Sequence, residues 1–196
     1  PDEAAIEFVR RYADNAGLKA EAEAAVESVR NLLNTMTFLT DAATLQAKQA
    51  TIVGAGAVYE EGERDCIGSW QDEKTIARWS MVVKNPGTYD VSVIQSMAGE
   101  PGSTYTIDFG GQAVQGEVKA TGDWNTFEPV AIGRVDLNRA GVYTVEFVPT
   151  SRKGQQVVNL RGIRLERSTD AGSRIHLTGA DFSAWREPTG TWKVCG

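Results

Sequence analysis

Apolar and polar residues alternate along two neighbouring runs of the chain, Ile76–Val83 and Thr88–Gln95. Such alternation places every second side chain on one face of a sheet. The residues between them, 84–87 (Lys-Asn-Pro-Gly), are typical of a turn because proline fixes φ and glycine accepts positive φ. The pattern predicts an antiparallel hairpin with Trp79 and Tyr89 on its buried face, at the centre of a β-sandwich.

Further short runs of β-forming residues follow one another, with Gly, Pro and Asn turns between them. Together with the first two they make about eight segments, a spacing typical of an all-β sandwich. The additional runs are Val53–Glu60, Thr104–Phe109, Gln112–Lys119, Phe127–Leu137, Val142–Val148 and Val157–Glu166.

Glycines mark special positions inside this β region. The apolar phase shifts across Gly133 and again across Gly162, which predicts a β-bulge at each. The pair Gly110-Gly111 is typical of a two-residue hairpin loop of the primed type.

The first part of the chain has a different pattern. Residues 2–35 contain a single glycine, Gly17, and their apolar residues recur at helical spacing. We expect two short antiparallel helices with Gly17 at the C-terminal stop of the first. Their apolar stripes need a partner, either the sandwich or a helical array preceding Pro1.

The composition and net charge of the chain argue against several classes of protein. The chain has 196 residues, a net charge of −6 and no Lys/Arg stripe, so a nucleic-acid partner is not expected. No run approaches the roughly 18 apolar residues of a membrane helix. Cys66 and Cys195 are too far apart in sequence for a disulfide framework or zinc site. The chain begins at Pro1 without a leader, so we expect a processed protein or an excised part of one.

Autonomous catalysis is not expected. The sequence has no nucleophile elbow, metal triad or phosphate loop, and His176 is the only histidine. The adjacent acidic pairs at 60–61 and 72–73 would point apart on a strand or be solvated on a loop, unlike the paired carboxylates of a glycosidase. We expect no cofactor.

Eight ordered segments carry a resemblance to a known family. They cover about 120 residues between Leu45 and Glu166: 45–54, 66–70, 77–79, 85–93, 105–112, 121–127, 140–150 and 157–165. The set resembles non-catalytic carbohydrate-binding modules of families 6 and 35, as appended to bacterial α-L-fucosidases and other secreted sugar hydrolases. The resemblance implies a galactose-binding-like jelly-roll β-sandwich, an oligo- or polysaccharide partner, and a secreted or periplasmic location.

The candidate sugar-stacking ring is Trp124. A sugar site needs an exposed flat ring and a few fixed polar groups. Trp124 lies in a turn-like segment and at the tryptophan of the family's TGxW motif, and Asp123 and Asn125 beside it supply acceptors and donors. The alternatives are a Trp124 ring folded onto the sandwich edge and solvated loop polar groups.

Three further residues are candidates for the same site. Trp70 stands at the start of a polar loop that supplies a second wall in family members, with Asp72 beside it. Asn159 breaks an apolar run, at a place where the resembling modules bond sugar hydroxyls. The alternatives are an edge-packing Trp70, a solvated Asp72, and an Asn159 that satisfies the backbone of a neighbouring loop.

The resemblance also has departures. Family 6 relatives commonly hold a structural calcium, with an acidic residue near the first strand and an Asp in the last. Lys48 and Arg161 stand at those places here. Because both are cationic, we expect no metal at that site.

The last segment suggests a further domain. Residues 177–186 and 188–194 resemble the opening of a 3-keto-disaccharide hydrolase, or concanavalin-like, domain. We therefore expect a helical hairpin at 1–40, a sandwich at 41–168, and at 169–196 the beginning of a following catalytic domain.

The leading hypothesis is a non-catalytic carbohydrate-binding module of a larger secreted, multidomain carbohydrate-active protein. The alternative is a structural spacer that packs a helical region against a catalytic domain and binds no sugar.

Overall fold

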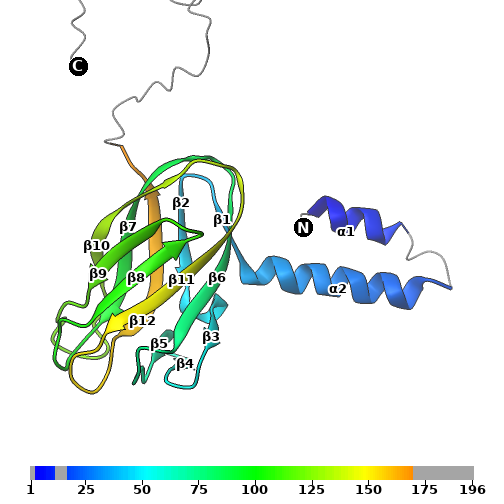
Figure 1. Cartoon of the computed structure of the whole chain (residues 1–196). Coiled ribbons are helices and arrows are strands. Elements are labelled where there is room, and N and C mark those ends of the chain that lie inside the picture. Colours follow the sequence, from blue (N-terminus) through cyan, green and yellow to red (C-terminus); the bar gives the residue numbers. More distant parts are fainter. Residues whose placement is uncertain (1–2, 12–16, 170–196) are drawn as a thin grey trace, which may run out of the picture.

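The computed structural model describes residues 3–11 and 17–169 of the chain, and its main body is a β-sandwich (Figure 1). Two helices precede the sandwich, α1 (Glu3–Arg10) and α2 (Lys19–Thr35). This confirms a mainly β fold preceded by helices. The tail from residue 170 onward, with the expected start of a following domain, His176 and Cys195, lies outside the described residues.

Each of the two sheets in the described part of the chain has six strands. Neighbours pair antiparallel except β1 and β6, which are parallel. The first sheet has the order β1 (Met36–Leu39), β6 (Ile76–Val83), β11 (Gly141–Ser151), β8 (Thr104–Phe109), β9 (Ala113–Glu117), with β3 (Thr51–Val53) also on β6. The second has the order β10 (Glu128–Leu137), β7 (Gly87–Ser96), β12 (Asn159–Arg167), β5 (Cys66–Gly68), β4 (Val58–Glu60), with β2 (Ala42–Gln46) also on β12.

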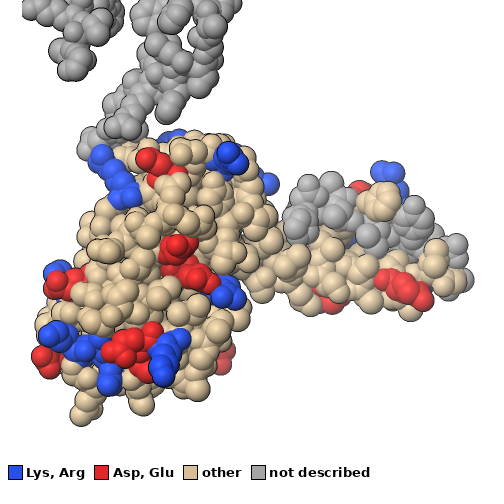
Figure 2. All heavy atoms as spheres, viewed as in Figure 1, with Lys and Arg blue, Asp and Glu red and all other residues tan. Residues whose placement is uncertain are grey.

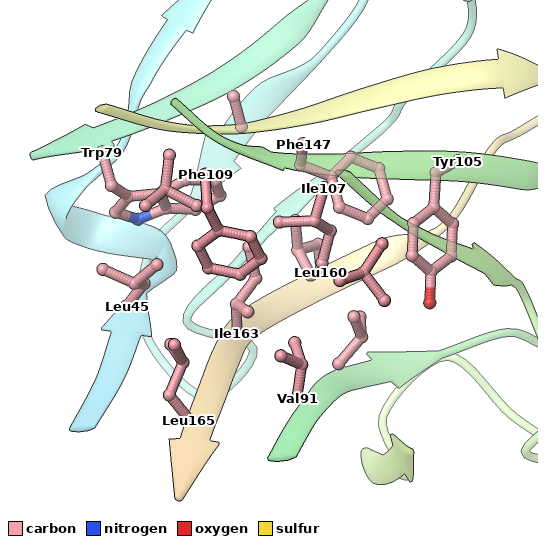
Figure 3. Packing of buried hydrophobic residues seen from close by; sticks show 14 of the residues in the cluster. Leu45, Trp79, Val91, Tyr105, Ile107, Phe109, Phe147, Leu160, Ile163 and Leu165 are labelled. Carbon is pink, nitrogen blue, oxygen red and sulfur yellow. The ribbon is translucent and has the colours of Figure 1, made fainter. Parts of the chain in front are cut away.

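The alternating runs bury one side chain in two, as expected. Trp79 and Tyr89 are both buried, and the rings of Tyr105 and Phe147 stack with centroids 4.4 Å apart. Figure 3 shows Trp79, Tyr105 and Phe147 of the first sheet in the space between the sheets, with Leu160 of the second sheet facing them. The core therefore lies between the two layers.

The predicted central hairpin is wrong. β6 pairs with β1, β3 and β11, whereas β7 pairs with β10 and β12 in the other sheet. Residues 84–86 carry the chain across the sandwich, and this corner is fixed by the Tyr89 hydroxyl and the Arg167 guanidinium, which both bond the carbonyl of Asn85. An alternating pattern fits either arrangement, because both bury one face of each strand.

Among the other local predictions, one strand is wrong, whereas the two β-bulges and the hairpin turn are confirmed. The run predicted as one strand at Val53–Glu60 is divided between β3 and β4, which belong to different sheets. The register shifts between Ala131 and Gly133 and between Leu160 and Gly162, which confirms both bulges. Both loop glycines of the β8–β9 hairpin, Gly110 and Gly111, have positive φ, as a primed turn requires.

The helices stand away from the sandwich (Figure 1). In α2 only Ala22 and Val26 are buried among the described side chains, while Leu18 and Leu32 are each 45% exposed. α2 ends at Thr35 and β1 begins at Met36, so the helix leads directly into the edge of the first sheet. No helix in the described residues is long and apolar enough to span a membrane.

We predict that Gly116→Ala destabilises the fold. Gly116 lies directly opposite Tyr105, and a Cβ at this position would come 2.5 Å from the tyrosine ring. The buried ring has little room to shift, so the free energy of unfolding should fall by about 1–3 kcal/mol. Urea denaturation measures this, with Gln115→Ala on the exposed face of the same strand as the control. A Gly116→Ala protein as stable as the control contradicts the prediction.

Candidate functional site

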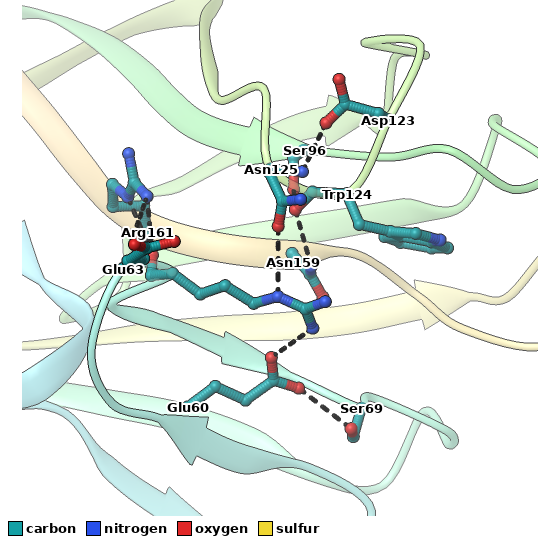
Figure 4. A network of polar contacts seen from close by, with 10 residues as sticks. Glu60, Glu63, Ser69, Ser96, Asp123, Trp124, Asn125, Asn159 and Arg161 are labelled. Carbon is teal, nitrogen blue, oxygen red and sulfur yellow. Dashed lines mark hydrogen bonds and ion pairs between the residues drawn. The ribbon is translucent and has the colours of Figure 1, made fainter.

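Three connections meet at one end of the sandwich: residues 61–65 between β4 and β5, 69–75 between β5 and β6, and 118–127 between β9 and β10. Hydrogen bonds link them to one another and to the first residue of β12 (Figure 4). This end contains all the candidate sugar-binding residues.

The turn that presents Trp124 is built by Asp123. Its carboxylate accepts hydrogen bonds from the backbone N–H groups of Asn125 (2.6 Å) and Thr126 (2.7 Å) and from the Thr126 hydroxyl (2.7 Å). These bonds lower the pKa of Asp123 below its usual value, and the bond from the Thr126 hydroxyl contributes most. Asp123 is therefore an ionised residue that organises the turn.

Trp124 is half-buried. Its backbone carbonyl accepts hydrogen bonds from Ser96 Oγ (2.8 Å) and Asn159 Nδ2 (3.3 Å). Its ring passes over Gly99, where a Cβ would lie 3.5 Å from the indole. The indole thus packs against the sandwich edge on one side and keeps part of its surface exposed.

Asn159 does not face solvent. Its side chain is only 2% exposed, and its amide bonds the Trp124 carbonyl. The structure therefore realises the alternative in which Asn159 satisfies a loop backbone, and it corrects the expectation of direct contact with sugar. The residue acts from beneath the turn that holds Trp124.

Trp70 is not the second wall of the site. Its side chain is fully buried, its ring centroid lies 5.1 Å from that of Phe147, and its Nε1–H donates to the Thr75 carbonyl at 3.2 Å. The preceding Ser69 has a φ of 52°, a left-handed conformation that reverses the chain after β5. The ring then enters the core, although polar residues surround it in the sequence.

Asp72 stabilises its own loop. Its Oδ1 accepts hydrogen bonds from the N–H groups of Thr75 (2.7 Å) and Lys74 (2.9 Å). The bond from Thr75 is the main cause that lowers the pKa of Asp72. The side chain also lies against Gly56, where a Cβ would come 2.0 Å from Oδ2. Asp72 is thus bonded within the loop that encloses Trp70.

Sequence reasoning missed a polar network beside Trp124. Arg64 donates to Glu60 Oε2 at 2.8 Å and to the side chain of Asn125 at 3.2 Å, and Glu60 Oε1 accepts from Ser69 Oγ at 3.0 Å. This network joins all three connections (Figure 4). A weak signal existed in the four-residue spacing of Glu60 and Arg64, but no local pattern points to Asn125, 61 residues away.

Arg161 fixes the 61–65 connection from the opposite side. Its guanidinium donates to the carbonyls of Glu63 (3.1 Å) and Arg64 (2.7 and 3.0 Å) and lies 3.7 Å from the ring centroid of Phe127. A cationic side chain thus holds backbone oxygens at one of the two positions where the sequence resemblance directed attention to a calcium site. Among the described residues, no group of three or more His, Cys, Asp or Glu is arranged to hold a metal.

The described residues offer no activated thiol. Cys66 is fully buried, and burial raises the pKa of its thiol to about 12. At neutral pH the group is protonated and unreactive. On the face shown in Figure 2, acidic and basic side chains lie interspersed. Several charged side chains of the described residues form ion pairs, such as Arg78 with Glu146 at 2.7 Å.

A family model and several solved structures match this chain. The model described as "Domain of unknown function (DUF5077)" matches residues 53–170. A search among curated proteins finds no match.

Among solved structures, a family 35 carbohydrate-binding module from Clostridium thermocellum is similar at 15% identity, with a TM-score of 0.55 over 66% of this chain and all of the module. The C-terminal CBM6 of LamC, a marine laminarinase from Zobellia galactanivorans, is similar at 16% identity and a TM-score of 0.54, over 65% of this chain and all of that module. A GH26-CBM35 β-(1,4)-mannanase from Podospora anserina is similar at 20% identity and a TM-score of 0.51. The match covers 65% of this chain and 28% of the enzyme.

These similarities establish a shared fold. The chain has the β-sandwich of family 6 and family 35 modules, as its sequence motifs predict. Several of the matched chains are titled as carbohydrate-binding modules. This chain matches only about a quarter of the length of the mannanase.

We predict that Arg161→Lys loosens the 61–65 connection. Lysine keeps the charge but loses the planar fork that bonds two carbonyls and stacks on Phe127. Tryptic cleavage after Arg64 should become about tenfold faster, as expected for a local opening that loses roughly 1.4 kcal/mol. Arg164→Lys, whose partner Glu166 lies on the surface, is the control. Equal cleavage rates in both variants contradict the prediction.

The Asp123 turn should depend on pH. Because the folded-state pKa of Asp123 is lowered, its stabilising contribution is present above the ordinary pKa of an aspartate, near 3.9, and is lost as pH falls through the lowered value. An NMR titration of the carboxyl carbon should place its midpoint below that of exposed aspartates. A midpoint at the ordinary value would show that the bonds to Asn125 and Thr126 do not persist in solution.

Proposed function

The chain belongs to the family described as "Domain of unknown function (DUF5077)", and from this premise we propose that it is a non-catalytic carbohydrate-binding module. Structures that share its fold are titled as carbohydrate-binding modules, which supports the proposal. We propose further that it is part of a larger secreted or periplasmic, multidomain carbohydrate-active protein. Its parts would be a helical region up to residue 35, the sandwich from 36 to 168, and from 169 the start of an adjacent catalytic domain. The boundary expected at residue 40 moves to 35, because β1 (Met36–Leu39) already pairs with β6 in the first sheet.

The observation that carries the proposal is the half-exposed Trp124 indole on a turn fixed from several sides. Asp123 bonds the turn from within, and Ser96 and Asn159 hold the Trp124 carbonyl. A ring fixed in this way can stack on the apolar face of a pyranose without losing its own freedom on binding.

Polar side chains that can bind sugar hydroxyls flank the turn that carries the ring. Asn125 and Arg64 are exposed and already bonded to each other, so their positions are fixed before a ligand arrives. Glu60 and Ser69 extend this polar surface toward β5. Asn159 and Asp123 contribute by positioning the turn.

The energetics favour a weak, reversible interaction. Covering about 60 Å² of apolar surface contributes about 1.5 kcal/mol at roughly 25 cal/mol per Å². Hydrogen bonds add to this and association costs subtract from it, giving a dissociation constant of about 10 μM to 1 mM. Such affinities suit a module that keeps an enzyme near a polymer.

A structural spacer is the second candidate function. Two observations favour it: Trp70 is fully buried, and the Asn159 amide is bonded to the Trp124 carbonyl. Neither group is then available to a ligand, and the sandwich would serve only to separate the helices from a following domain.

The test is a titration with soluble glycans, followed by tryptophan fluorescence and calorimetry. Trp124→Ala should abolish the response or weaken it by more than tenfold, with little loss of folding stability. Tyr143→Ala is the matched control, because Tyr143 is also half-buried but lies near Gly110, at the other end of β8. Absence of any response by the wild-type protein at millimolar glycan would leave the spacer.

A further inference from the structure

Arg64 is the basic group that Asn125 holds beside the proposed stacking ring, and its charge is already compensated. Its Nη1 lies 2.8 Å from Glu60 Oε2, and its Nε donates to Asn125. Resting on the sugar-binding function proposed above, we propose that this site takes neutral glycans and rejects glycans that carry uronic acids, because Glu60 occupies and neutralises Arg64.

The position of Glu60 is fixed. Its second carboxylate oxygen accepts a hydrogen bond from Ser69 Oγ at 3.0 Å, and only 20% of its side chain is exposed, against 45% for Arg64. Arg64 is held as well, because Arg161 bonds its backbone carbonyl. The ion pair is therefore part of the site's architecture and differs from a mobile surface pair.

Hydroxyl groups and carboxylates would meet Arg64 differently. A guanidinium has five N–H donors, and the contacts with Glu60 and Asn125 use two of them. The half-exposed remainder can donate to neutral hydroxyl oxygens of a sugar. A uronate carboxylate would have to share the guanidinium with Glu60, which brings two like charges close together.

The surroundings add to this repulsion. Residues 60–65 carry four carboxylates and one guanidinium, and Asp123 and Arg161 add one charge of each sign. Asp123 stays ionised at neutral pH because its pKa is lowered. This group of side chains therefore carries five negative charges and two positive ones, and a uronate would add a further negative charge.

The test compares glycans that differ only at C6, such as galacto-oligosaccharides and the matching oligogalacturonates, at low salt. The wild-type protein should bind the neutral member at least tenfold more tightly. Glu60→Gln uncovers the Arg64 charge and should raise the ratio of uronate affinity to neutral-glycan affinity about tenfold. This gain should shrink as salt is raised.

Glu61→Gln is the control, because it removes one nearby charge from an exposed side chain on the adjacent residue and leaves the Arg64–Glu60 pair intact. Thermal unfolding of each variant checks folding. The inference is overturned if the wild-type protein binds the uronate as well as its neutral counterpart, or if Glu60→Gln and Glu61→Gln change the preference equally. Binding of neither glycan class by the wild-type protein would instead overturn the proposed sugar-binding function.

Discussion

Packing of aromatic rings around Phe147 is the contact on which the sandwich and its candidate site depend. The Phe147 ring lies 4.4 Å from Tyr105 and 5.1 Å from Trp70, centroid to centroid, and all three side chains are buried. Tyr105 and Phe147 belong to the first sheet, whereas Trp70 follows β5 of the second. The cluster therefore joins the two layers near the end where the site lies.

The burial of Trp70 determines the form of the site. Once this ring is inside, the 69–75 loop closes over it, held by Asp72 and by the Thr75 carbonyl. The other candidate ring, Trp124, then stands on the surface without an aromatic partner from that loop. Its polar neighbours come from the 61–65 connection, which Arg161 fixes. The site is thus one ring beside an amide and a compensated guanidinium.

Alternation of side chains predicted which residues are buried, and it did so well for Trp79, Tyr89 and Tyr105. It could not predict which sheet a strand joins, since strands facing each other across a core alternate as hairpin partners do. The β6–β7 connection was misassigned for this reason. Trp70 was misplaced because its neighbours are polar, and the left-handed Ser69 that turns it inward has no strong local signal. The position of Arg64 depends on Asn125 and Arg161, which lie far away in the sequence, and no single-sequence pattern reveals those contacts.

The direct junction between α2 and β1 has a mechanical consequence. At the end of the helix the Met36 N–H bonds the Leu33 carbonyl, while Met36 also pairs with Ser80 in the sheet. Because one residue takes part in both elements, no hinge separates them. The last turn of α2 is therefore joined to the edge strand of the first sheet without an intervening loop. A force that tilts α2 would therefore act first on the pairing of β1 with β6.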